Sequence, residues 1–180
     1  AQAVIRHFRN QKKYKAIIIA GHSEGSLIGM VAARREKADG FISLAGAGSP
    51  IDVVIEGQIE RQAPALLEAT RQAFARLRQG DTVNISNPAL LSLFRPSVQP
   101  YMISWLKYNP QTEIRQLQVP TLIINGTKDL QVLVPEAELL KKAKPEASLI
   151  LIENMNHVLK DIPGGLAENR QSYTNPDLPV

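Results

Sequence analysis

The chain contains no cysteine among its 180 residues. This absence excludes a disulfide framework, a thiolate metal site and a cysteine nucleophile. Long hydrophobic runs are also missing: uninterrupted apolar stretches such as residues 16–20 and 149–152 are short, whereas a membrane-spanning helix needs about 20 residues. There is no low-complexity segment, and 44% of the residues are hydrophobic and 21% charged. The composition therefore predicts one ordinary globular domain without a membrane span.

Basic residues are in slight excess, with a net charge of +4 and a sequence pI of about 9.4. Residues 1–50 hold eight Lys and Arg against three Asp and Glu, whereas the rest of the chain holds 13 against 14. The excess thus falls in one short stretch, residues 6–15, which is typical of the solvated face of a helix. Because a nucleic-acid surface more often repeats along the chain and includes aromatic side chains, we expect no nucleic-acid partner.

Short apolar runs rich in β-branched residues predict buried strands of a parallel sheet. These strands are expected at residues 15–20, 41–45, 120–124 and 147–153. Helical spacing of apolar residues predicts a helix over 26–37, between the first two strands, and another over 135–144, between the last two. Strands and helices that alternate in this way indicate an α/β fold with right-handed crossovers.

A stretch of about 60 residues interrupts this alternation. Residues 50–110 contain no strand pattern; instead they predict a long helix over 51–78, broken near Pro64, and shorter helices over 88–94 and 98–108. We therefore expect residues 1–49 and 111–180 to form the α/β core and residues 50–110 to form a helical cap. A further short helix is predicted over 3–9, whereas the polar residues after Pro163 predict only loop.

The sequence GHSEG at residues 21–25 fits the G-x-S-x-G nucleophile elbow. This chemistry needs a serine raised from a strand end on a strained turn, with glycines where a Cβ atom would clash. The following helix then directs its N-terminal N–H groups at the reaction centre. Because the motif lies directly after a predicted strand and before an amphipathic helix, Ser23 is the candidate nucleophile.

A serine needs a base to take its proton, and the chain has three histidines. His7 lies on a basic helix and His22 lies within the elbow, where its side chain is expected to diverge from Ser23. His157 follows the last predicted strand and is the candidate base. Asp129 follows the preceding strand and is the candidate acid, because the ends of parallel strands open on one edge of a sheet.

Glu153 and Asp161 are weaker candidates for the acid, since neither follows a separate strand.

The order of these motifs resembles the α/β-hydrolase superfamily, and is similar to its lysophospholipase-like and serine-aminopeptidase-like esterase branch. The resemblance extends over about residues 1–162 and includes the segments at 99–110, 124–129 and 155–160. It implies the nucleophile at Ser23, the acid at Asp129 and the base at His157. It also implies that the backbone N–H of Glu24 is one oxyanion donor.

The superfamily fold has eight strands, and the four predicted here correspond to the last four. In that fold the strand at 15–20 is central and pairs with a strand that has no counterpart in this chain. A long apolar strand with an unpaired edge tends to aggregate. We therefore expect a preceding segment of about 100 residues, in the same or a separate chain, to complete the domain. The closing helix that the family has after the histidine loop is not evident either.

These observations predict a serine hydrolase that cleaves carboxylic esters through an acyl-enzyme, with no metal or organic cofactor. Apolar cap residues would line a pocket for a small-molecule ester, and Tyr101, Met102 and Trp105 are the candidate substrate contacts. A peptidase or thioesterase with the same three residues stays open as an alternative. So does a non-catalytic binding module of the same fold.

Overall fold

The computed structural model describes residues 1–178, and the chain divides into two compact units. One unit contains Ala1–Gly48 and the residues from Pro110 onward, and the other is Ser49–Asn109. The first unit carries all the strands among the described residues, and the second is helical. No helix within residues 1–178 is both long enough and apolar enough to cross a membrane.

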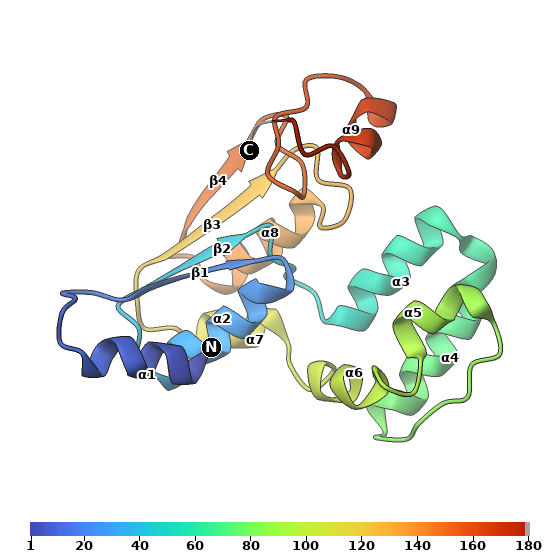
Figure 1. Cartoon of the computed structure of the whole chain (residues 1–180), viewed down its shortest axis with the longest axis horizontal. Helices are drawn as coiled ribbons and strands as arrows, with labels where there is room; N and C mark the ends of the chain where they lie inside the picture. The colour runs from blue at the N-terminus through green and yellow to red at the C-terminus, as the bar shows by residue number, and fades with distance from the viewer. Residues whose placement is uncertain (179–180) are drawn as a thin grey trace. The chain divides into compact units, whose positions relative to one another are not determined.

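The first unit is built on a four-stranded parallel sheet whose strands lie side by side in chain order (Figure 1). The strands are β1 (Ile18–His22), β2 (Gly40–Leu44), β3 (Thr121–Gly126) and β4 (Ser148–Ile152). The predicted α/β fold with four parallel strands is thus confirmed. The prediction of 15–20 for the first strand was wrong at both ends, because β1 starts at Ile18 and continues to His22, directly before Ser23.

Helices cover one face of this sheet (Figure 1). Helix α2 (Glu24–Arg35) packs on β1 and β2, and α8 (Val134–Ala143) packs on β3 and β4. Between them lies α7 (Pro110–Arg115), a short helix that the sequence did not predict; its Glu113 accepts a hydrogen bond of 3.1 Å from Arg34 of α2. Helix α1 (Gln2–Asn10) contacts α2.

The opposite face of the sheet is apolar and exposed. Side chains alternate along a strand, and the register places a set of apolar residues together on this side: Ile18, Ala20, Ile42, Leu44, Leu122, Ile124, Ile150 and Ile152. We call this set the open face. Ile18, Ile150 and Ile152 are 62%, 47% and 40% exposed. The sequence predicted a buried first strand, and among the residues described this does not hold for β1.

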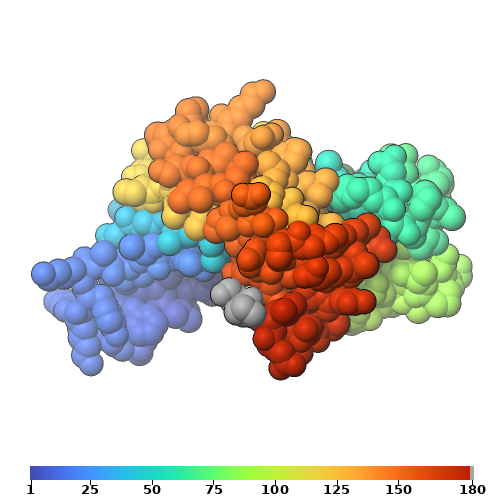
Figure 2. Space-filling view, turned by 90° about the horizontal axis from the view of Figure 1, so that it is seen from above, coloured from blue at the N-terminus to red at the C-terminus, as the bar shows by residue number. Residues whose placement is uncertain are grey.

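A helix follows the histidine loop, where the sequence predicted only loop. Helix α9 (Leu166–Ser172) begins after Gly165 and buries Asn169 and Ser172. Its buried side chains are polar, so the helix has no apolar stripe that a periodicity analysis could detect. In the space-filling view, this red C-terminal segment lies against the orange loops that follow β3 and β4 (Figure 2).

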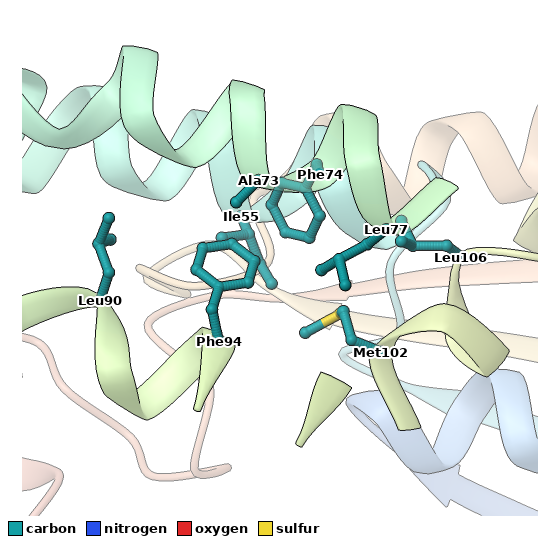
Figure 3. Close-up of a cluster of buried hydrophobic side chains, with 8 residues drawn as sticks. All are labelled: Ile55, Ala73, Phe74, Leu77, Leu90, Phe94, Met102 and Leu106. Atoms are coloured by element: carbon teal, nitrogen blue, oxygen red, sulfur yellow. The ribbon is translucent and has the colours of Figure 1, made fainter. Parts of the chain in front are cut away.

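The second unit is a bundle of short helices around its own core. The helices are α3 (Ile51–Gln62), η1 (Pro64–Leu66), α4 (Leu67–Arg78), η2 (Pro88–Leu90), α5 (Leu91–Phe94) and α6 (Gln99–Trp105). As the proline predicted, the long helix is interrupted at Ala63, directly before Pro64. Phe74 and Phe94 meet edge to face at the centre, with ring centroids 5.0 Å apart, and Met102 packs beside them (Figure 3).

Two adjacent leucines of the helical unit allow a test of how its core is packed. Leu90 is 1% exposed and belongs to the buried cluster, whereas Leu91 is 39% exposed. Leu90→Ala leaves a cavity and is expected to lower the free energy of unfolding by about 2–5 kcal/mol. Leu91→Ala is the matched control and should cost less than about 1 kcal/mol. Urea denaturation measures both values, and equal losses would contradict this packing.

Candidate active site

The serine of the motif lies on a strained turn between β1 and α2. Ser23 has φ 54° and ψ −122°, and residues with a Cβ atom rarely adopt such a positive φ. Its N–H donates to the carbonyl of Leu44 at the end of β2, at 2.8 Å. This bond fixes the turn at the carboxyl edge of the sheet. The strain therefore lies at the residue predicted as the nucleophile.

Only one of the two motif glycines is required by space among the residues described. A Cβ atom at Gly21 would clash with the backbone carbonyl of Gly25, which closes the turn. At Gly25 a Cβ atom would meet no atom within 4 Å. The prediction that both glycines avoid a steric clash was thus right for Gly21 and wrong for Gly25.

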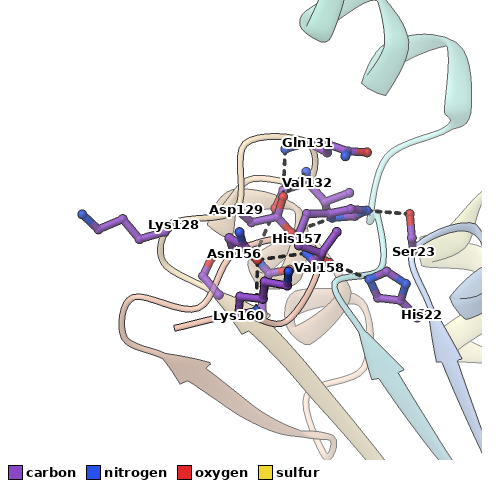
Figure 4. Close-up of polar contacts among 12 residues, drawn as sticks. His22, Ser23, Lys128, Asp129, Gln131, Val132, Asn156, His157, Val158 and Lys160 are labelled. Atoms are coloured by element: carbon purple, nitrogen blue, oxygen red, sulfur yellow. Dashed lines mark hydrogen bonds and ion pairs between the residues drawn. The ribbon is translucent and has the colours of Figure 1, made fainter. Parts of the chain in front are cut away.

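The structure brings Ser23, His157 and Asp129 together, as the strand order predicted (Figure 4). His157 Nε2 lies 3.0 Å from the Ser23 hydroxyl oxygen, and His157 Nδ1 lies 2.8 Å from Asp129 Oδ2. An ionised carboxylate can only accept hydrogen bonds, so Nδ1 carries the ring proton. Nε2 is therefore an acceptor and points at the hydroxyl proton of Ser23.

Asp129 is held by the backbone of its own loop. Its Oδ1 accepts hydrogen bonds of 2.8 Å from the N–H groups of Gln131 and Val132, while Oδ2 faces His157. The side chain of Asp129 has no exposed surface, and that of His157 is 5% exposed. Both carboxylate oxygens are therefore used, and the carboxylate cannot rotate without losing bonds. The rival acids Glu153 and Asp161 are exposed.

The histidine loop is anchored on the elbow itself. His22 Nε2–H donates to the backbone carbonyl of His157 at 2.7 Å, because a carbonyl oxygen can only accept. The two imidazole rings lie with their centroids 5.0 Å apart. No local pattern predicts this contact, since the two histidines are far apart in the chain. His7 lies exposed on α1 and bonds to Gln11.

Burial changes the proton affinity of two side chains near the site. Partial burial raises the pKa of Glu24, the first residue of α2. Burial also raises the pKa of Tyr173, and the negative charge of Asp129 raises it further. The backbone N–H of Glu24 is the first of α2 and lies at the positive end of that helix.

The candidate substrate residues belong to the helical unit. Tyr101 is 45% exposed and its ring lies 5.6 Å from that of Trp105, which is half-buried against the core. Met102 is 3% exposed and packs within the core of that unit. Its side chain therefore has almost no surface to offer a substrate, and this position corresponds to packing. Residues 1–178 contain no cluster of His, Asp and Glu placed to hold a metal ion.

A close backbone approach connects the acid loop to the histidine loop. A Cβ atom at Gly126, the last residue of β3, would clash with the carbonyl of Met155. Met155 lies two residues before His157, and its carbonyl accepts from the N–H of Lys128, directly before Asp129, at 3.0 Å. Glycine is thus the residue that lets the two loops meet.

Gly126→Ala should push the loops apart and lower the free energy of unfolding by about 1–3 kcal/mol, the usual cost of overpacking an interior. The matched control is Gly165→Ala, where a Cβ atom would meet nothing within 4 Å. Urea denaturation compares the two variants. A loss of similar size in both would show that the close approach is not what matters.

No family model matches the chain. Among curated proteins, esterase EstD of Thermotoga maritima is 24% identical over 166 residues, which cover 88% of this chain and 39% of the esterase. Among solved structures, Est1E from Butyrivibrio proteoclasticus superposes with a TM-score of 0.57 at 18% identity. That match covers 87% of this chain and 59% of Est1E.

An α/β-fold family hydrolase from Bacillus anthracis superposes with a TM-score of 0.53 at 16% identity, over 86% of this chain and 66% of the hydrolase. The chain thus spans well under half the length of the esterase it matches in sequence, and 59% and 66% of the two structures. Together with the parallel sheet and its topology, these similarities identify the architecture of this chain as the α/β-hydrolase fold.

Proposed function

We propose that this chain carries the reaction centre of a serine hydrolase that cleaves carboxylic esters through an acyl-enzyme. The observation that carries the proposal is the directional chain of hydrogen bonds from Ser23 through His157 to Asp129. The proton on His157 Nδ1 is donated to the carboxylate of Asp129, so Nε2 can accept the hydroxyl proton of Ser23. This is the arrangement that a weak serine nucleophile needs at neutral pH.

In the first half of the reaction, His157 Nε2 takes the hydroxyl proton while Ser23 Oγ attacks the ester carbonyl carbon. The carbonyl oxygen becomes negative and is stabilised by the backbone N–H of Glu24 at the positive end of α2. Asp129 stabilises the imidazolium that forms. The tetrahedral intermediate then collapses, His157 gives its proton to the leaving alcohol, and the acyl group stays on Ser23.

In the second half, water takes the place of the alcohol. His157 removes a proton from the water, the resulting hydroxide attacks the acyl carbon, and the same N–H of Glu24 receives the oxyanion. His157 then returns a proton to Ser23 as the acid leaves. Both halves use His157 as the base and the backbone N–H of Glu24 as a donor to the oxyanion. Neither half, as proposed, involves a metal or an organic cofactor.

The helical unit is proposed as the cap over this centre. It is inserted between β2 and α7, both of which belong to the sheet-bearing unit. Tyr101 and Trp105 are the aromatic residues through which it would contact an acyl or aryl group. Met102 would act through the core that supports these two rings. The esterase named among the relatives favours an ester as substrate.

The open face is proposed to be covered by a preceding segment of the same protein, in one chain or as a second chain. Eight apolar residues on this face, with Ile18 62% exposed, would otherwise remain in water. Large exposed apolar patches are rare in proteins that act alone. The edge of β1 that does not pair with β2 also offers backbone groups for another strand.

A fluorescent dye that binds apolar surface, anilinonaphthalene sulfonate, tests this covering. We expect strong dye fluorescence with the 180-residue chain and several-fold less, per mole, with the complete natural polypeptide that contains it. The Ile150→Lys variant of the 180-residue chain should bind less dye than the parent. Equal fluorescence from the chain and the complete polypeptide would contradict the proposal.

The reaction is tested with three substrates that share one acyl group and differ in the leaving group: an ester, a thioester and an amide. With the complete polypeptide we expect the ester to be hydrolysed fastest, with a burst of about one alcohol per enzyme molecule as the acyl-enzyme forms. Faster turnover of the amide or thioester would favour the peptidase or thioesterase alternative. Absence of turnover for all three would favour the non-catalytic binding module.

A further inference from the structure

A buried polar network lies behind the two loops that carry Asp129 and His157. The first loop includes Lys128 and the second includes Asn156, each the residue directly before its candidate catalytic neighbour. Neither residue contacts Ser23 in the described structure, yet each determines where its neighbour's backbone lies. The network connects both residues to one side chain of α9, Asn169.

Asn169 joins the two loops through a single amide group. Its Nδ2–H donates to the backbone carbonyl of Lys128 at 2.6 Å, and its Oδ1 accepts from Asn156 Nδ2 at 3.2 Å. Asn169 is 2% exposed and Asn156 is completely buried. Because one end of the amide donates and the other accepts, no other side chain of this size satisfies both loops.

Asn156 passes this connection to the histidine loop. Its Oδ1 accepts from the backbone N–H groups of Val158 and Lys160, at 3.0 and 3.1 Å, which closes the loop around His157 (Figure 4). Its Nδ2 also donates to the Ser172 hydroxyl at 2.7 Å, and that hydroxyl donates to the backbone carbonyl of Asn169 at 2.7 Å. The network therefore has a partner at both ends of each amide.

We propose that Asn169 is a positioning residue of the reaction: it fixes the acid loop relative to the histidine loop and so sets the contact between Asp129 and His157. The inference rests on the proposed function. It assigns α9, which lies outside the strands and the elbow, a part in catalysis. After loss of the amide the backbone bond from Lys128 to Met155 would still join the loops, but the distance between Nδ1 and Oδ2 would become variable.

Two variants remove the amide in different ways. Asn169→Asp is nearly isosteric and keeps an acceptor for Asn156, but it places an oxygen against the carbonyl of Lys128. Asn169→Leu removes both bonds. The matched control is Gln171→Ala, an exposed residue of the same helix. In the complete polypeptide we expect kcat for ester hydrolysis to fall by about 10- to 100-fold in both Asn169 variants, and KM to change by less than about twofold.

A double-mutant cycle separates positioning from simple loss of fold stability. In an Asp129→Ala background the contact between residue 129 and His157 is already lost, so Asn169→Asp should lower kcat by less than about twofold. An undiminished loss in that background would overturn the proposal, because Asn169 would then act independently of the contact. Unchanged kcat in the parent background would overturn it as well.

Hydrogen exchange gives a readout that does not depend on activity. In Asn169→Asp the amides of Gln131, Val132 and Lys160 should exchange faster, while those of α2 keep the rate of the parent protein. Unchanged exchange at the three loop amides would overturn the proposal even if the protein proves not to be an esterase. Failure of the proposed function has a different signature: the parent polypeptide and its Ser23→Ala variant would then hydrolyse esters equally slowly.

Discussion

Replacing Ser23 with alanine is expected to lower kcat for ester hydrolysis by about 10⁴- to 10⁶-fold, because the variant has no atom that can carry the acyl group. The fold should survive the change. The side chain is partly exposed, and its loss removes one hydrogen bond to His157. KM should stay within about threefold, since the hydroxyl contributes to bond formation rather than to substrate binding. Steady-state kinetics with the complete polypeptide measures both constants.

The control for this experiment is Ser26→Ala, three residues along the same turn and helix. Ser26 is buried and its hydroxyl bonds to that of Ser43 at 2.7 Å, in the interior between α2 and β2. It has no part in the proposed reaction, so kcat should change by less than about threefold. An equal kcat for Ser23→Ala and the parent would refute Ser23 as the nucleophile.

Asp129→Asn is expected to lower kcat by about 10⁴-fold through the protonation state of His157. The two backbone N–H groups of Gln131 and Val132 require an oxygen at the Oδ1 position, so the new amide would keep its oxygen there. Its NH₂ group would then face His157 Nδ1 and donate to it. The ring proton would move to Nε2, which could no longer take the proton of Ser23.

Glu153→Gln is the matched control, since it makes the same loss of a carboxylate at an exposed residue of the loop after β4. Its kcat should remain within about twofold of the parent value. Steady-state kinetics on one nitrophenyl ester compares kcat of the two variants. A large loss of kcat in Glu153→Gln together with a small loss in Asp129→Asn would show that Glu153, and not Asp129, is the acid.

Much of this site is predictable from the sequence because its parts follow strand ends. The run of β-branched residues before GHSEG predicts a strand, and the apolar spacing after it predicts α2. Once the sheet is known to be parallel, Asp129 and His157 must emerge at the same edge as Ser23. The structure then brings the three side chains within hydrogen-bond distance, which no local pattern specifies.

The parts that sequence patterns did not predict are polar contacts over long separations. Helix α9 buries Asn169 and Ser172 rather than apolar residues, so hydrophobic periodicity predicts loop there. Helix α7 is only six residues long, too short for a periodic pattern. The bond from His22 to the carbonyl of His157 joins residues 135 apart in the chain. Such contacts depend on the assembled fold and leave no local signature.

Covalent trapping of the nucleophile tests the central claim most directly. A fluorophosphonate reacts with an activated serine and leaves a stable adduct, which tryptic digestion and mass spectrometry assign to one residue. The account predicts an adduct on Ser23 in the complete polypeptide, and at least a 100-fold slower reaction, on the order of the loss of base catalysis, in His157→Ala. An adduct elsewhere, or equal labelling rates in the parent and His157→Ala, would contradict it.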